Sequence, residues 1–411
     1  MQQKVLVIED SSTSMKVLRK LIEKAGLIPV SAMTLTEARH IFNNDVPEDY
    51  LCALVDFNVP DAPEGESIDF TIESFIPTIV ITGRLDQNTR KKILAKEIVD
   101  YIPKENAQVY EYLSRLMARL QKNKKIAILV VDDSRVSRTS VTSLLQRHNF
   151  KTYEASDGLE GLEALRQYND IKLVLTDENM PNMNGVEMVA EMRRKYNKES
   201  LAIIGLSSMD SDGLSARFLK SGANDYLSKG FGHEEFFCRI IQNIEYLENV
   251  EAIHRAANSD YLTGLPNRRH FFTRVNAGLI VAPSAVSLAI LDVDNFKQLN
   301  DAHGHDGGDK VLKEIAKLIA VRFVSHTVCR FGGEEFCIFM PHVTNEKALE
   351  ILQSFCEEIA ARQIVFNDKV INCTLSIGLS SDFSGDIKQT LKEADSNLYK
   401  AKQLGKNQVV G

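Results

Sequence analysis

The sequence predicts an α/β multidomain protein, with two doubly wound parallel sheets followed by an α+β domain. The chain has 411 residues, which is too long for one ordinary hydrophobic core. Strand patterns alternate with amphipathic helix patterns twice within about the first 245 residues. Such alternation is typical of parallel sheets covered on both faces. From Ser259 onward the pattern changes to a strand, long helical runs, a hairpin and a closing helix.

The composition is that of a globular protein, with 44% hydrophobic and 26% charged residues. No apolar run is long enough to span a bilayer and no signal peptide precedes the first strand pattern, so we expect a cytoplasmic protein with no membrane insertion. The net charge of −7 argues against a nucleic-acid partner. The six cysteines show no CxxC spacing and fall mostly in apolar runs, which indicates buried reduced thiols.

Four landmarks recur in the same order in both copies, at offsets of 121 to 125 residues. They are a strand ending in two acids, a strand ending in Asp, a strand ending in a hydroxyl residue, and an aromatic residue shortly followed by lysine. The polar landmarks are Glu9, Asp10, Asp56, Thr82 and Lys104 in the first copy, and Asp132, Asp133, Asp177, Ser207 and Lys229 in the second.

All these landmarks lie at the carboxyl ends of predicted strands, where parallel sheets bind their ligands. Each set should therefore converge at one edge of its sheet. Three clustered carboxylates need a divalent cation, and oxygen-only ligands favour Mg²⁺. The lysine and the hydroxyl group suit a phosphoryl group on the central Asp. Helix capping is the simpler alternative for one acid, but it does not explain the whole set in two copies.

The repeat resembles the receiver domain of two-component response regulators, which has a flavodoxin-like fold with a five-stranded parallel sheet. The resemblance implies that Asp56 and Asp177 accept a phosphoryl group from a histidine kinase and that each receiver holds one Mg²⁺. The hydroxyl residue and the lysine would read the phosphate, and Tyr101 and Tyr226 match the family's switch aromatic. The usual proline after the lysine is absent, and the loop after Asp56 is one residue longer than its counterpart. Alternatively, one receiver is a silent dimerisation module.

A connector at 246–258 joins the second copy to the last domain. The longer segment 233–258 contains no Gly or Pro, and its apolar positions 237, 240, 244 and 247 predict one helix. Two interpretations remain open: an ordinary last receiver helix plus a linker, or a stalk that pairs with the same helix of a second copy. We expect the domains to span 1–122 (receiver one), 123–245 (receiver two) and 259–411.

The last domain contains "RFGGEEF" at 330–336, which follows an apolar, strand-like run that begins at Ala320. Gly-Gly suits a hairpin turn, but two adjacent carboxylates repel each other unless a positive group lies beside them. The earlier strand "SLAILDVD" ends in Asp292 and Asp294. If that strand lies beside the hairpin, Asp292 and Glu334 can face each other and hold a divalent metal, which normally accompanies phosphate chemistry.

This domain resembles a GGDEF diguanylate cyclase over about 150 residues. "GGEEF" is an accepted form of the signature, and "DYLTGLPNRR", "DVDNFKQLND" and "GHDGGDKVL" match other motifs of the family. The resemblance implies a palm-like α+β core of the βαββαβ type. It also implies the reaction, in which a homodimer condenses two GTP into cyclic di-GMP and releases two pyrophosphates, with two Mg²⁺ in each half-site.

The resemblance also assigns roles to individual residues. Mg²⁺ would be held by Asp292, the main-chain carbonyl of Val293 and Glu334. The proton of the attacking 3′-hydroxyl group would pass to Glu334, with Glu335 beside it in support. Guanine would be read by Asn300 and Asp309, and the phosphates would be bound by Lys297, Lys402 and Lys406.

Many family members carry an R-x-x-D product-binding site shortly before the signature, whereas this chain has Phe323 and His326 at those positions. We expect phosphorylation to shift the population of dimers that can bring two GTP together. One rival function is a catalytically weak domain that binds nucleotide as a sensor, which would normally show a broken signature. The other is a phosphorelay scaffold, which would need neither Asn300 nor Asp309.

Overall fold

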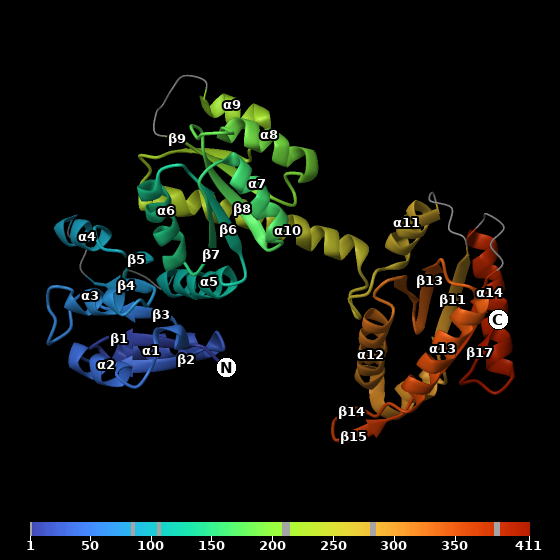
Figure 1. Ribbon diagram of the computed structural model, residues 1–411. Helices are drawn as coiled ribbons and strands as arrows, with labels where there is room; N and C mark the ends of the chain where they lie inside the picture. The colour runs from blue at the N-terminus through green and yellow to red at the C-terminus, as the bar shows by residue number, and fades with distance from the viewer. Residues whose placement is uncertain (1, 84–86, 105–107, 208–213, 280–284, 382–386) are drawn as a thin grey trace. The chain divides into compact units, whose positions relative to one another are not determined.

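The computed structural model describes residues 2–83, 87–104, 108–207, 214–279, 285–381 and 387–411 (Figure 1). The chain forms two compact units, Met1–Asn249 and Val250–Gly411. Within the described residues, the first unit contains two parallel five-stranded sheets, and the second contains a mixed five-stranded sheet and a two-stranded hairpin. The predicted α/β multidomain fold class is confirmed.

Receiver one has the strand order β2-β1-β3-β4-β5, with parallel strand pairs. One hydrophobic cluster lies under α1 and α5 and another under α2, α3 and α4, so helices cover both faces of the sheet. Its elements are β1 Lys4–Ile8, α1 Ser12–Lys24, β2 Ile28–Ala32, α2 Leu35–Phe42, the 3-10 turn Pro47–Asp49, β3 Tyr50–Val55, α3 Glu66–Glu73, β4 Thr78–Thr82, α4 Gln87–Leu94, β5 Asp100–Pro103 and α5 Gln108–Asn123.

Receiver two repeats this topology with the order β7-β6-β8-β9-β10. One cluster lies under α7, α8 and α9, and the other lies under α6 and α10. Its elements are β6 Ala127–Val131, α6 Arg135–Arg147, β7 Lys151–Ala155, α7 Gly158–Gln167, β8 Ile171–Asp177, α8 Gly185–Lys195, β9 Ala202–Ser207, α9 Leu214–Ser221, β10 Asp225–Ser228 and α10 His233–Asn258.

The serines after each acid pair begin the first helix of each receiver. Ser11 and Ser134 are the N-caps of α1 and α6, and their side chains accept hydrogen bonds from the backbone N–H groups of Ser14 and Ser137. Because each cap directly follows the end of a strand, the acid pair is fixed at the carboxyl edge of the sheet.

The second unit is built on a sheet with the order β12-β13-β11-β16-β17, in which β16 and β17 are parallel and the other pairs are antiparallel. Helices α12 and α13 cover one face and α11 and α14 the other. Its elements are α11 Arg268–Leu279, β11 Val286–Val293, α12 Phe296–Arg322, β12 Thr327–Gly332, β13 Glu335–Pro341, α13 Asn345–Ala360, β14 Ile364–Phe366, β15 Lys369–Ile371, β16 Leu375–Ser380, α14 Ile387–Gln403 and β17 Val409–Val410.

The run that begins at Ala320 is not a strand at its start, so that interpretation was wrong. Helix α12 continues to Arg322, and strand β12 begins only at Thr327. The reason is the four-residue spacing of Ile315, Ile319 and Phe323, which are buried in the core of the second unit and favour a helix at this point.

The predicted connector helix is present as the single helix α10. Its residues Phe237, Ile240, Ile244 and Leu247 are buried in receiver two. That apolar stripe therefore belongs to an ordinary last receiver helix, which continues beyond the receiver. None of the helices in the described part of the chain has the length and hydrophobicity needed to cross a membrane.

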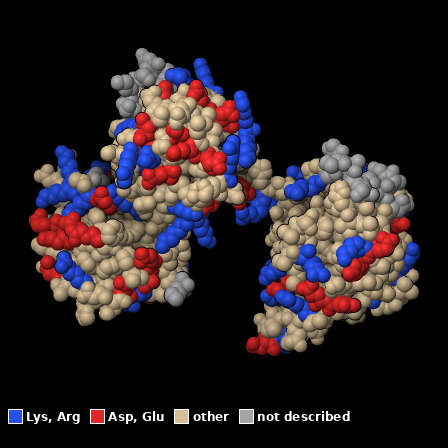
Figure 2. All heavy atoms as spheres, viewed as in Figure 1, with Lys and Arg blue, Asp and Glu red and all other residues tan. Residues whose placement is uncertain are grey.

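The surface and the cysteines agree with a globular chain. Basic and acidic side chains are interspersed over the visible face of both units (Figure 2). All six cysteines are free, and five of them are buried as expected, whereas Cys238 on α10 is exposed.

Candidate functional site

Each receiver brings its acidic landmarks together at the carboxyl end of its sheet. Two triads have carboxylate oxygens within 4.8 Å of one another: Glu9, Asp10 and Asp56, and Asp132, Asp133 and Asp177. In each triad the second acid is exposed and the other two are buried.

The lysine of receiver one lies between two of these acids. Lys104 Nζ donates to Glu9 Oε2 at 2.7 Å and to Asp56 Oδ2 at 2.6 Å. Burial raises the pKa of Glu9, and the hydrogen bond from Lys104 opposes that shift. Burial also works against the charge on Lys104, but its bonds to Asp56 and Glu9 outweigh this and raise the pKa of the lysine. The lysine is thus held as a cation beside Asp56.

Receiver two has the same arrangement. Lys229 Nζ lies 2.8 Å from Asp132 Oδ2 and 2.7 Å from Asp177 Oδ1. Burial raises the pKa of Asp177, with Lys229 acting in the opposite direction. Asp132 also accepts a hydrogen bond from Ser137 Oγ at 2.7 Å, and its carbonyl accepts one from Arg138 at 2.6 Å. These bonds fix Asp132 next to Asp177.

The two hydroxyl landmarks stand beside their lysines. Thr82 and Ser207 end their strands and are buried. The backbone N–H of Lys104 donates to the carbonyl of Thr82 at 2.8 Å, and that of Lys229 donates to the carbonyl of Ser207 at 2.7 Å. The donor sets fit Mg²⁺, since a hard cation prefers carboxylate oxygens and each triad offers three of them.

The signature hairpin of the second unit has the predicted turn. Strand β12 ends at Gly332 and β13 begins at Glu335, so Gly333 and Glu334 form the turn. Gly333 has φ = 48°, a conformation that suits glycine. The register pairs Asp292 with Glu335, which differs by one residue from the expected pairing with Glu334. Glu334 lies next along the turn, where its carbonyl faces the N–H of Val293 at 3.4 Å.

Among the acids at this end of the sheet, Asp292 forms an ion pair with a lysine. Asp292 is 5% exposed, and Lys402 Nζ on α14 lies 2.8 Å from its Oδ2 atom. Burial raises the pKa of Asp292 in spite of this lysine, and burial together with the charge of Asp292 raises the pKa of Glu335. Carboxylates held in this way gain from a divalent cation. The groups expected to hold Mg²⁺ here, on Asp292, Val293 and Glu334, offer only oxygen atoms, which is the type of ligand that Mg²⁺ prefers.

The residues expected to read guanine lie on both sides of a kink in α12. Gly304 has φ = 74°, so the helix consists of two segments, with Asn300 before the kink and Asp309 after it. A Cβ atom on Gly308 would lie 1.9 Å from Asn300 Oδ1, so only glycine lets this amide approach so closely. Asn300 Oδ1 is buried and has no hydrogen-bond partner in the described part of the chain. A ligand with a donor edge would supply that partner.

Two of the three lysines are fixed near this end of the sheet. Lys402 pairs with Asp292, and Lys406 Nζ donates to Asn295 Oδ1 at 2.6 Å. Lys297, the third lysine, lies in the first turn of α12 and is exposed. The structure thus brings Lys402 and Lys406 to the strand end that carries Asp292.

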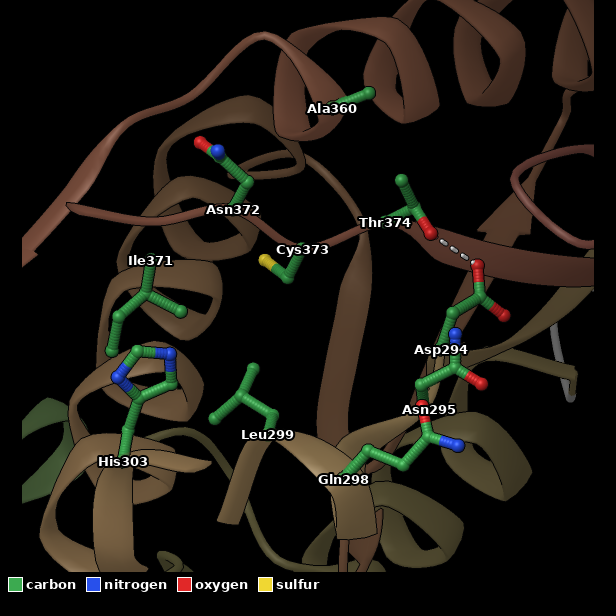
Figure 3. A pocket seen from close by; sticks show the side chains of 10 residues that line it. All are labelled: Asp294, Asn295, Gln298, Leu299, His303, Ala360, Ile371, Asn372, Cys373 and Thr374. Carbon is green, nitrogen blue, oxygen red and sulfur yellow. Dashed lines mark hydrogen bonds between the residues drawn. The ribbon is translucent and has the colours of Figure 1, made fainter. Parts of the chain in front are cut away.

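A cavity of about 330 Å³ adjoins this site behind the turn at 294–295 (Figure 3). Gln298, Leu299 and His303 line it from α12, whereas Asn300 packs toward Gly308. Figure 3 shows the bond from Thr374 to Asp294 at its edge. The cavity is therefore separate from the pair of residues expected to read the base.

Sequence reasoning missed two residues that position the site. Asp294 is buried and accepts bonds from Thr374, Ser376 and the backbone of Asn407, so it ties the end of β11 to the tail after α14. The second residue is Arg330.

Arg330 donates to the carbonyl of Gly333 at 2.6 and 2.9 Å and pairs with Asp260 at 3.0 Å. It thus joins the signature turn to the "DYLTGL" segment. The presence of that segment was the one sequence signal for this contact.

The comparisons with known proteins match this division of the chain. The family described as "Diguanylate cyclase, GGDEF domain" matches residues 257–408, and "Response regulator receiver domain" matches residues 128–241. The response regulator PleD of Caulobacter vibrioides is 30% identical over 300 residues, which cover 69% of this chain and 65% of PleD. The diguanylate cyclase VdcA of Vibrio cholerae is 36% identical over 176 residues, which cover 40% of this chain and 49% of VdcA.

A solved structure gives the same result. The crystal structure of a protein described as a two-component response regulator with a GGDEF domain aligns with a TM-score of 0.52 and 40% identity, and it covers 60% of this chain and 100% of that chain. The chain combines a receiver fold, in which acids and a lysine lie together at one site, with a domain that carries the GGEEF hairpin. This combination defines a response regulator with an output domain. The chain belongs to the response regulators that carry a GGDEF domain.

Proposed function

We propose that this protein is a diguanylate cyclase that condenses two GTP into cyclic di-GMP and two pyrophosphates. The observation that carries the proposal is the arrangement at the end of β11. There, buried Asp292 lies opposite Glu335 and beside Glu334, with Lys402 at 2.8 Å. Acids that converge with a lysine suit a bound polyphosphate and its cation. A relative named for this activity, VdcA, supports the proposal.

The roles of the residues follow from their positions. Asp292, the carbonyl of Val293 and Glu334 would hold Mg²⁺, with two ions in each half-site. When bound, Mg²⁺ neutralises the triphosphate and lowers the pKa of the attacking hydroxyl group. Glu334 takes the proton of the 3′-hydroxyl group of one GTP. The 3′-oxygen then bonds to the α-phosphorus of the other GTP, and pyrophosphate leaves from that phosphorus. Glu335 stands beside Glu334 and adds negative charge.

Substrate recognition is divided between two groups of residues. Asp309 and Asn300 lie on the two segments of α12 and read the donor edge of guanine, which adenine lacks. The phosphates contact Lys297, Lys402 and Lys406. Lys406 is a point charge, because lysine offers no guanidinium fork. The hydrogen bond from Lys406 to Asn295 places Lys406 at the start of α12, the helix that carries Lys297.

One GGDEF domain holds one GTP, so the reaction needs two copies of the chain face to face. For each new phosphodiester bond, the domain at 259–411 of one copy then holds the GTP that gives the 3′-oxygen, and that of the other copy holds the GTP that gives the α-phosphorus. Positioning is the main catalytic contribution, since both reactants are held in line by separate copies. Any input that changes the pairing of two chains therefore changes the rate.

The receivers provide that input. A histidine kinase donates a phosphoryl group to Asp177, and Asp56 is the second acceptor. Each receiver holds one Mg²⁺ at its acid triad, and Lys104 and Lys229 bind the phosphate together with Thr82 and Ser207. The half-buried lysine beside each acceptor supports this proposal, since it offsets the added negative charge.

The test is product measurement with the purified full chain, GTP and Mg²⁺, with and without beryllofluoride as an acyl-phosphate analogue. Cyclic di-GMP should form, and Asp292→Asn should abolish it while the protein still folds. GTP binding without any turnover would overturn the proposal in favour of a nucleotide sensor.

A further inference from the structure

Asp292 and Lys402 form an ion pair at the end of the sheet that carries the signature hairpin. Lys402 Nζ lies 2.8 Å from Asp292 Oδ2, and within the described part of the chain it is the ion-pair partner of this carboxylate. The side chain of Asp292 is 8% exposed, whereas that of Lys402 is 36% exposed. A carboxylate that is largely buried needs an opposite charge, because it has lost most of its hydration. Lys402 supplies that charge.

The attachment of Lys402 leaves it free to move. It lies in the last turn of α14, and among the described residues Asp292 is the polar group that its side chain contacts. Lys406 at the same end of the sheet is bonded to an amide instead, since its Nζ donates to Asn295 Oδ1 at 2.6 Å. A lysine carries its charge on a flexible four-carbon stem. Lys402 can therefore leave Asp292 without any movement of the helix.

The acids of this site are less concentrated than those of the receivers. In each receiver three carboxylates lie within 4.8 Å of one another, whereas Asp292 belongs to no such group of three within the residues that the structure describes. Mg²⁺ at nucleotide sites is usually bound through one or two carboxylates together with phosphate oxygens of the substrate. A divalent cation at Asp292 therefore needs the phosphates of a nucleotide to complete its set of ligands.

Lys402 and a divalent cation compete for the same carboxylate. A cation that binds alone has to displace the ammonium group from Asp292, and two positive groups beside one carboxylate repel each other. A cation that arrives with a triphosphate meets a different situation, because the phosphate oxygens offer the displaced ammonium group a new partner. The ion pair thus opposes the cation alone and does not oppose the cation together with a nucleotide.

We propose that Lys402 is an exchangeable counter-ion of this site, which neutralises Asp292 while no nucleotide is bound and moves to the phosphates when a cation and a nucleotide bind together. This inference rests on the proposed function and adds a second role to a lysine that was assigned only a phosphate contact. It follows that the cation and the nucleotide bind cooperatively, and that each raises the affinity of the other by the same factor.

The test measures binding and no turnover. Mn²⁺ is the probe, because it accepts carboxylate and phosphate oxygens as Mg²⁺ does and its paramagnetic signal distinguishes the free ion from the bound ion. The nucleotide is a GTP analogue with a methylene group between the α- and β-phosphates, from which no pyrophosphate can leave. All proteins are the full chain with Asp56→Asn and Asp177→Asn, which weaken the cation sites of the receivers. This background chain is called the parent below.

Without the analogue, Lys402→Gln should bind Mn²⁺ about tenfold more tightly than the parent, because the cation no longer competes with an ion pair to a largely buried carboxylate. Lys402→Arg keeps the charge and should bind Mn²⁺ as weakly as the parent does. The analogue should strengthen Mn²⁺ binding in the parent and should do so less in Lys402→Gln. In the parent, Mn²⁺ should raise the affinity for the analogue by the same factor.

Two neighbouring lysines provide matched controls. Lys406→Gln removes a positive charge from the same end of the sheet, and Lys400→Gln removes one from the exposed face of α14, where Lys400 Nζ donates to Asn397 Oδ1 at 2.9 Å. Neither lysine is paired with an acid, so both variants should bind Mn²⁺ without the analogue nearly as the parent does. Circular dichroism checks that each variant folds.

Equal Mn²⁺ affinity of Lys402→Gln and the parent would overturn the exchange, and so would an increase of the same size in Lys406→Gln. If Lys402→Gln does not fold, the parent decides, because a Mn²⁺ affinity that does not depend on the analogue would also overturn it. Asp292→Asn separates this result from the proposed function. Mn²⁺ that still binds to Asp292→Asn with the analogue as tightly as to the parent would overturn the metal site itself as well as the exchange.

Discussion

The acid sites of the receivers and of the cyclase-type domain share a carboxylate–lysine pair but differ in how the other acids are arranged around it. In each site a buried carboxylate at the end of a strand is paired with a lysine at 2.6 to 2.8 Å. In the receivers the lysine bridges two acids, and the three acids lie within 4.8 Å of one another. In the second unit Lys402 binds Asp292, Glu334 lies on the hairpin turn, and Glu335 begins strand β13 opposite Asp292.

This difference suits two sizes of ligand. In the receivers the proposed ligands are one cation and one small phosphoryl group. In the second unit the proposed ligand is a whole nucleotide, and Asn300 Oδ1, which has no hydrogen-bond partner among the described residues, offers it an acceptor. Under the proposed function, the same carboxylate–lysine chemistry therefore serves switching in one unit and substrate binding in the other.

The largest effect is expected at Glu334. Glu334→Gln should lower the rate of cyclic di-GMP formation by about 10²-fold or more, because it removes a general base and a metal ligand together. Turnover of GTP is measured by separation of the nucleotide products. The matched control is Glu314→Gln, which lies on α12 in a surface ion pair with Lys317 and should retain full activity. Near-normal turnover by Glu334→Gln would contradict its role.

The second effect concerns the base. The native chain should prefer GTP over ATP by about 10²-fold or more in kcat/KM, because ATP would leave Asp309 and Asn300 without their donors. Asp309→Asn should narrow this ratio, mainly by slowing GTP. Competition between the two nucleotides in one reaction measures the ratio directly. Comparable use of ATP by the native chain would rule out this assignment.

The third effect sharpens the comparison between the receivers. Beryllofluoride should change activity by about tenfold through a shift in the population of competent dimers. Asp177→Asn should remove most of this response, since α10 follows directly from receiver two, and Asp56→Asn is the matched control. If Asp56→Asn abolishes the response and Asp177→Asn leaves it intact, receiver one is the main input.

The fourth effect is a pH dependence of the cyclase site. Burial raises the pKa of Asp292 and of Glu335, so both take up a proton at higher pH than ordinary carboxyl groups do. The protonated forms cannot serve the metal, and activity should fall as pH drops through these raised values, above the ordinary carboxyl pKa of about 4. The acid limb of the kcat/KM profile tests this. A flat profile down to pH about 4 would disagree with it.

The smallest effect is product inhibition. Phe323 is buried against Phe355 with ring centroids 5.3 Å apart, and Arg322 is the last residue of a helix with its side chain near Ser354. Phe323 has no guanidinium group, and the guanidinium group of Arg322 lies one position out of register with an R-x-x-D site and donates to Ser354 Oγ at 3.4 Å. Added cyclic di-GMP should therefore cause little non-competitive inhibition in progress curves. Strong inhibition that is lost on mutation of residues 322–326 would show that the chain rebuilds the site.

The sequence predicts those parts of the fold and site whose residues recur or cluster along the chain. The acids, hydroxyls and lysines of the receivers stand at strand ends in both copies, so their convergence follows from the parallel topology. The hairpin turn follows from its two glycines. The predicted strand-like run began too early, at Ala320, because β-branched residues such as Val321 and Val324 are typical of strands. In the structure, Ile319 and Phe323 are instead buried on one face of helix α12, which continues to Arg322.

Contacts between distant segments were not accessible from the sequence. Asp294 and Arg330 bind groups that lie 80 or 70 residues away in the chain. One-residue register, as between Asp292 and Glu335, likewise depends on the turn geometry of the folded hairpin.

The most direct test of the central claim is the stoichiometry of the reaction. The purified full chain is incubated with GTP and Mg²⁺, and the nucleotide products and pyrophosphate are quantified over time. The account predicts one cyclic di-GMP and two pyrophosphates for every two GTP consumed, with no such product from Glu334→Gln. Conversion of GTP to GDP and phosphate, or tight GTP binding with no conversion, would contradict it.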